Sequence, residues 1–113
     1  MKRKKLTASM IALVMSVSLP MTTYAANWYL EDGSVTVNAD NSGQTVTQGG
    51  GSAVPDEAPV ITQRESSVET GNTIAISTSD NAAANVTIKD INIKSSNDAI
   101  DVKGSFSANI TLE

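Results

Sequence analysis

The sequence predicts an all-β protein whose strands form a right-handed parallel β-helix, placed after a secretory signal peptide. The stretch ANVTIKD, which begins at Ala84, returns as ANITLE from Ala108, 24 residues later. Beyond the first 25 residues no helical period occurs, and Val, Ile and Thr alternate with polar residues. A repeat of this length is typical of solenoids, in which each unit buries its inner face against the next. A β-sandwich is the alternative, because alternating strands fit that fold as well.

The first residues have the three-part layout of a signal peptide. MKRKK is basic, the run from Leu6 to Leu19 is apolar and uncharged, and small residues precede Ala25. We expect residues 1–25 to be removed by cleavage after Ala25, or one residue later after Ala26. The apolar run is shorter than the roughly 20 residues that span a bilayer. The sequence therefore predicts a secreted, extracellular protein that associates with the cell surface and keeps no membrane segment after cleavage.

The composition beyond Ala25 excludes several classes of partner and of stabilising bond. Four basic residues stand against twelve acidic ones there, a net charge of −8. Such a surface repels nucleic acid and anionic lipid. The chain has no Cys, so disulfides cannot compensate for a small core. We expect the stability to come from stacked β-branched residues, from a bound ion, or from further chain.

Turn-forming residues divide the predicted mature chain into three parts. Residues 26–48 form a short N-terminal β segment with Asp-Gly and Asn-Ser-Gly turns. Residues 49–59 are a Gly- and Pro-rich linker. Residues 60–113 are the start of a β-helix domain that we expect to be truncated, because no polar capping segment follows the last predicted strand.

Within the predicted β-helix, pairs of aliphatic residues at two-residue spacing are expected to point inward. These pairs are Ile74/Ile76, Val86/Ile88, Ile91/Ile93, Ile100/Val102 and Ile110/Leu112. A corner at Lys89-Asp90 accounts for the change of parity between the second and third pairs. The repeat sets Val86 beside Ile110, Ile88 beside Leu112, and Asn85 beside Asn109. We expect the two Asn side chains to form an amide ladder.

Six short stretches occur in an order that resembles a known family. They are WYLEDGS from Trp28, GQTVTQ from Gly43, NTIAI at 72–76, ANVTI at 84–88, INI at 91–93 and NITLE at 109–113. The order is similar to that in large repetitive exported proteins of Gram-positive gut bacteria that carry a β-helical carbohydrate-binding domain. The resemblance implies a polysaccharide, or a glycan of a host or bacterial surface, as the partner. It also implies that the strand matching NITLE is followed by further coils.

Few residues suit catalysis or cofactor binding. The chain has neither His nor Cys, which excludes Ser-His-Asp and Cys-His nucleophile systems and the common zinc sites. Asn97, Asp98 and Asp101 are candidate Ca²⁺ ligands at a coil corner, because Ca²⁺ binds carboxylate and carbonyl oxygens. The alternative is a solvated turn with Asp101 paired to Lys103 or Lys94. No other cofactor is predicted.

Two adjacent aromatic residues are the candidate ligand contacts. Trp28 and Tyr29 are able to stack on a sugar ring, or alternatively to pack and shield the N-terminal end of the first β unit. We therefore expect a non-enzymatic carbohydrate-binding or adhesin-like surface module. The alternatives are the N-terminal part of a β-helical polysaccharide lyase or hydrolase, and a structural surface stalk.

Overall fold

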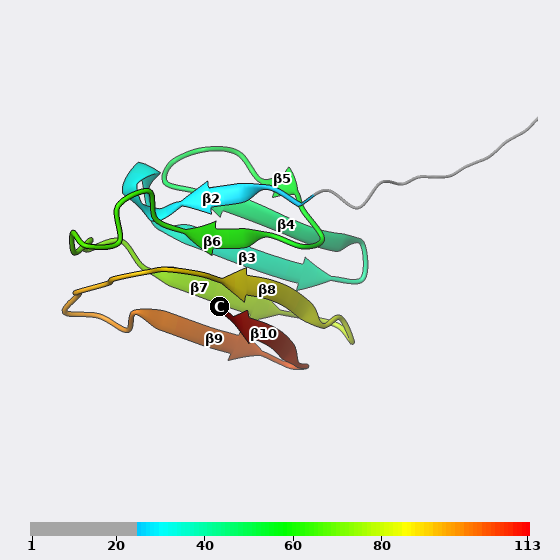
Figure 1. The fold of residues 1–113 in the computed structure, drawn as a ribbon. Coiled ribbons are helices and arrows are strands. Elements are labelled where there is room, and N and C mark those ends of the chain that lie inside the picture. The colour runs from blue at the N-terminus through cyan, green and yellow to red at the C-terminus, as the bar shows by residue number, and fades with distance from the viewer. Residues whose placement is uncertain (1–24) are drawn as a thin grey trace, which may run out of the picture.

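A computed structural model describes residues 25–113 as a chain of short strands with a single turn of helix (Figure 1). The predicted all-β class is confirmed. The strands are β2 (Asn27–Tyr29), β3 (Val35–Asp40), β4 (Gly43–Gln48), β5 (Val54–Pro55), β6 (Val60–Thr62), β7 (Ile74–Thr78), β8 (Ala84–Ile88), β9 (Ile100–Gly104) and β10 (Ala108–Leu112). A 3₁₀ turn, η1 (Leu30–Asp32), follows β2. The predicted signal peptide lies outside the described residues, except for Ala25.

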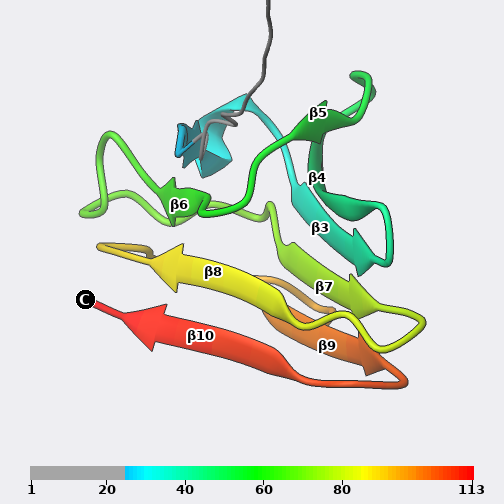
Figure 2. The same cartoon turned by 90° about the vertical axis from the view of Figure 1, so that its right-hand side faces the viewer.

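The strands form two sheets that face each other across the core (Figures 1 and 2). One has the order β10-β8-β6-β2, and all its neighbours are parallel. The other has the order β5-β4-β3-β7-β9; β3, β7 and β9 are parallel, whereas β3, β4 and β5 are joined by antiparallel pairing. From β6 onward, successive strands alternate between the two sheets.

The predicted pairing of the repeat is confirmed by the register of β8 and β10. Val86 pairs with Ile110 and Ile88 pairs with Leu112 in a parallel ladder. Asn85 pairs with Asn109, and the Asn109 amide Nδ2 donates to Asn85 Oδ1 at 3.0 Å. The 24-residue repeat therefore sets equivalent residues beside each other on neighbouring strands.

The core is aliphatic and is supplied by alternate positions of the strands, as the two-residue period predicts. Its most enclosed members, at 0–1% exposure, are Leu30, Val35, Val37, Val46, Ile61, Ile74, Ile76 and Ala84. Val35 and Val37 of β3 pair in register with Ile74 and Ile76 of β7. The aliphatic rows on adjacent strands thus pack as continuous ridges inside the two sheets.

The prediction of a strand around Ile91 and Ile93 is wrong. These side chains pack against the core, but only an isolated bridge between Thr70 and Ile93 forms there. The predicted corner is confirmed, because Asp90 adopts a left-handed conformation with φ 52°. Beyond it, Asn92 bonds to a side-chain and a backbone oxygen of the 63–66 segment, and its carbonyl accepts the N–H of Thr70. Because the Gln63 side chain accepts the Asn92 N–H, the pairing here stays a single bridge and does not extend into a ladder.

The prediction that the last two aliphatic pairs are interior is also wrong for the described chain. Ile100 and Val102 of β9 are 37% and 47% exposed, and Ile110 and Leu112 of β10 are 37% and 73% exposed. Their parity matches that of the buried residues on β7 and β8. They remain open to solvent because β9 and β10 are edge strands, each with a neighbour on one side only.

The Gly- and Pro-rich linker at residues 49–59 contains a strand and buried residues. β5 lies within it and pairs with β4, and Asp56 and Pro59 are fully buried. Strands on its two sides also pair directly, β2 with β6 and β3 with β7. Within residues 25–113, no helix has the length and apolar character that crossing a membrane requires.

Candidate functional site

The three predicted Ca²⁺ ligands come together at one open cleft. The cleft has a volume of about 450 Å³ and lies where the 94–99 loop meets the first residues of β7 and β9. Its lining residues are Thr73, Ile74, Ala75, Ser96, Asn97, Asp98 and Asp101. The three residues that the sequence grouped are therefore neighbours in space.

Some polar groups at this cleft are already paired with neighbouring residues. Lys103 Nζ lies 3.2 Å from Asp101 Oδ2, which is the ion pair that the turn interpretation predicted. The backbone N–H of Asn97 donates to Ser95 Oγ at 3.0 Å. Within residues 25–113, no group of three or more His, Cys, Asp or Glu residues is arranged to hold a metal. Ca²⁺ prefers about six to eight oxygens, so calcium binding stays a prediction.

A second open cleft, of about 340 Å³, includes Tyr29. Its lining comes from the starts and ends of strands in the all-parallel sheet: Asn27, Tyr29, Val60, Thr62, Gln63, Lys89 and Glu113. Tyr29 pairs in register with Thr62, while the preceding Trp28 packs against the core. Because successive side chains of a strand point to opposite faces, Tyr29 faces outward with the polar residues of this cleft.

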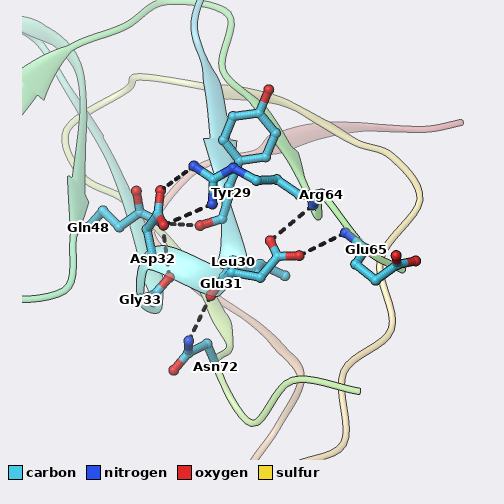
Figure 3. Close-up of polar contacts among 9 residues, drawn as sticks. All are labelled: Tyr29, Leu30, Glu31, Asp32, Gly33, Gln48, Arg64, Glu65 and Asn72. Atoms are coloured by element: carbon cyan, nitrogen blue, oxygen red, sulfur yellow. Dashed lines mark hydrogen bonds and ion pairs between the residues drawn. The ribbon is translucent and has the colours of Figure 1, made fainter. Parts of the chain in front are cut away.

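Arg64 stacks on the ring of Tyr29 (Figure 3), with its guanidinium carbon 4.2 Å from the ring centroid. The same guanidinium makes a two-pronged contact with the carboxylate of Asp32, at 2.9 and 2.8 Å. The hydrogen bond from Arg64 holds the pKa of Asp32 below its ordinary value. A planar cation held by a carboxylate thereby fixes the orientation of the tyrosine ring.

Glu31 fastens the neighbouring chain segment to the same place. Its carboxylate accepts the backbone N–H groups of Arg64 and Glu65 at 3.0 and 2.9 Å (Figure 3). Desolvation is the largest single influence on the pKa of Glu31 and acts to raise it. The backbone donors and the charge of Arg64 together outweigh it, so the pKa lies below its ordinary value. Residues 31–32 and 64–65 therefore form one polar bracket beside Tyr29.

Trp28 and Tyr29 have different surroundings, although they are adjacent in sequence. Trp28 is half-buried, packs against the core cluster and donates its indole Nε1–H to Asp56 Oδ2 at 2.8 Å. This is the packing alternative of the sequence analysis. Tyr29 lines the outward cleft and is the better placed of the two for a ligand. Stacking of either ring on a sugar stays a prediction.

Sequence reasoning missed the polar side chains that join the strands from inside. Gln44 bonds to backbone atoms of Asp56 and Asn85, and the Gln48 amide donates to the carbonyls of Tyr29 and Gly33. The signal was available, because GQTVTQ places Gln44 and Gln48 on the same face of β4 as buried Val46. A polar residue at an inward position of a strand needs hydrogen-bond partners there.

Comparison with known proteins found no matching family model, no similar curated protein and no similar solved structure.

Proposed function

We propose that this chain is an exported, non-catalytic polysaccharide-binding module of the bacterial surface, built on the start of a right-handed parallel β-helix. The parallel ladders and the alternation of the chain between two sheets support this architecture. They disfavour the β-sandwich, whose two sheets are antiparallel. The β-helix in turn offers outward strand faces on which an extended polymer can lie.

The observation that favours polysaccharide binding is the cleft that contains Tyr29. Binding sites for small ligands and sugar units combine an apolar or aromatic surface with a few placed polar groups. Here Tyr29 lines the cleft together with Thr62 and Asn27, which carry a hydroxyl and an amide. Arg64 and Asp32 hold the ring in place, so little side-chain freedom remains to be lost when a ligand binds.

Affinity electrophoresis of the secreted chain tests this proposal. The gels contain a neutral glucan, a xylan or an acidic polygalacturonate, each with Ca²⁺ or with EDTA. We expect at least one polymer to retard the chain, and Tyr29→Ala to weaken binding by about tenfold, the effect of losing roughly 1.4 kcal/mol. Retardation in Ca²⁺ but not in EDTA would support the prediction for Asn97, Asp98 and Asp101.

The matched control is Phe106→Ala, which removes another aromatic ring that is 55% exposed and lies outside the Tyr29 cleft. We expect Phe106→Ala to bind like the unaltered chain, with circular dichroism showing that both variants fold. Equal losses in the two variants, or no retardation by any polymer, would count against the proposal. Release of shortened polymer would indicate the lyase or hydrolase alternative. A chain that neither binds nor cleaves would fit the stalk.

A further inference from the structure

Asp56 is a fully buried carboxylate beside the start of β2. Asp56 follows β5 and precedes β6 along the chain, and it is 0% exposed. Three N–H groups donate to it: the backbone nitrogens of Ala26 and Ala58, at 3.1 and 3.0 Å, and the indole Nε1 of Trp28, at 2.8 Å. Ala26 and Trp28 share Oδ2, and Ala58 donates to Oδ1.

All three of these donors are neutral while residue 25 is joined to Ala26. The ion pairs among residues 25–113 join Arg64 to Asp32 and Lys103 to Asp101, so neither Lys nor Arg pairs with Asp56 in the described part. Burying a carboxylate is costly unless a charge of opposite sign and hydrogen bonds compensate for the lost water. The carboxylate of Asp56 therefore has hydrogen-bond donors around it but no cation paired with it in the described part of the chain.

We propose that Asp56 receives the N-terminal ammonium group that cleavage after Ala25 creates at Ala26. Hydrolysis of the Ala25–Ala26 peptide bond adds one water. The leader leaves with a carboxylate, and the Ala26 nitrogen becomes an amine that takes up a proton. The nitrogen that now donates one neutral N–H at 3.1 Å would then carry a full positive charge and three hydrogens. This inference rests on the proposed export.

Contacts of the main chain keep Ala26 in place after cleavage. The Ala26 carbonyl accepts the N–H of Val60 at 3.0 Å, and Asn27 pairs with Val60 at the start of the β2–β6 ladder. The new ammonium would thus stay beside Asp56 without rearrangement. Cleavage one residue later would remove this nitrogen and its anchoring carbonyl. The new terminus would then begin about 3.8 Å along the chain, so the geometry favours the earlier bond.

The consequence is that leader removal and folding stability are coupled at this position. While the leader is attached, Ala26 offers one neutral hydrogen bond to a buried charge. After cleavage, an ion pair between the part-buried ammonium and the buried Asp56 carboxylate replaces it. Removing the cation from such a pair is destabilising, because it leaves the buried carboxylate without a charge partner. The processed chain is therefore expected to be the more stable form.

The test compares two matched chains, one that begins at Ala26 and one extended by a single glycine before it. The extension turns the Ala26 nitrogen back into a peptide N–H and moves the ammonium by about 3.8 Å. We expect the extended chain to show an unfolding equilibrium constant raised by about tenfold or more. The same comparison in Asp56→Asn should show little difference, because no buried charge is present to receive the cation. Equal effects with Asp and Asn at position 56 would overturn the proposal.

A second measurement applies even if Asp56→Asn fails to fold. Amine-selective reductive methylation of the native chain, followed by mass spectrometry, compares the Ala26 amine with the exposed Lys89. We expect methylation of Ala26 to be slowed at least about tenfold in the folded chain and to recover in denaturant, because an ammonium paired with the buried Asp56 carboxylate is not free to react. Comparable native rates, or a secreted chain that begins at Asn27, would refute the proposal. Neither result depends on polysaccharide binding, which the electrophoresis tests separately.

Discussion

Replacing Gln44 by Met tests how the two sheets are joined through polar groups. Gln44 extends from β4 in one sheet to β8 in the other and is 3% exposed. Its Nε2 donates to the carbonyls of Asp56 and Asn85, at 3.0 and 2.9 Å, and its Oε1 accepts the N–H of Asn85 at 2.8 Å. β6 pairs with β8 only from Thr87 onward, so the Gln44 amide occupies the place of the missing strand beside Asn85.

The magnitude follows from the groups that the substitution leaves without a partner. Met has a similar length but offers neither an amide donor nor a carbonyl acceptor. The Asp56 carbonyl loses a buried partner, and the N–H and carbonyl of Asn85 lose partners in a half-buried place. Each unsatisfied group costs about 1–3 kcal/mol, with the lower end where water reaches it. We therefore expect Gln44→Met to lower the free energy of unfolding by about 3–5 kcal/mol.

Urea denaturation followed by the fluorescence of Trp28, the single Trp of the chain, measures this loss. Gln48→Met is the matched control, because Gln48 lies on the same strand but is half-buried and loses two hydrogen bonds where Gln44 loses three. We expect Gln48→Met to cost about 1–2 kcal/mol, since water can replace part of what is lost. A loss below about 0.5 kcal/mol in Gln44→Met, or a larger loss in the control, would refute the reasoning.

Three further predictions concern a glycine in β9, the burial of β8 and β10, and the carboxylates with lowered pKa values. Gly104→Ala should cost about 2 kcal/mol or more in thermal denaturation, because Gly104 has φ +132° and a Cβ there would collide with Thr78; Gly50→Ala, with nothing near, should be neutral. Ile88→Ala should cost about 2–4 kcal/mol but Leu112→Ala under about 1 kcal/mol, since Ile88 is 3% exposed and Leu112 73%; equal losses would mean that β10 is covered in solution. The lowered pKa values of Glu31, Asp32 and Asp40 stabilise the fold above about pH 4, and this stability is lost as pH falls through the folded-state values. A pH series of melting temperatures should fall less steeply on acidification in Arg64→Ala.

The sequence predicted the regular part of this fold because that part depends on period and repeat. Alternation located the inward positions of β7 and β8, and the repeat predicted the register of Val86 with Ile110. Alternation failed at Ile91 and Ile93, where the Gln63 side chain accepts the Asn92 N–H and the Asn92 amide donates to the Ser66 carbonyl. Alternation also wrongly predicted that the aliphatic residues of β9 and β10 are buried. It identifies which side chains share one face of a strand, but burial of that face also depends on whether another strand lies beside it.

The candidate sites were predictable to a similar degree. Asn97, Asp98 and Asp101 were grouped because they are close in sequence, and the loop keeps them together. The polar bracket beside Tyr29 was not foreseen, because Asp32 and Arg64 are 32 residues apart and meet only when β2 and β6 pair. The surroundings of Asp56 were likewise hidden, since its donors come from the start of β2 and from its own turn.

The open sides of β9 and β10 give the molecule a direction in which it comes apart. The large aliphatic side chains of these two strands are 37–73% exposed, whereas those of β3 and β7 are at the centre of the core. Local opening of low cost is expected to start where few buried contacts hold a strand. Amide hydrogens of β10 should therefore exchange with deuterium soonest, those of β8 later, and those of β3 last, so that fraying proceeds inward from one end.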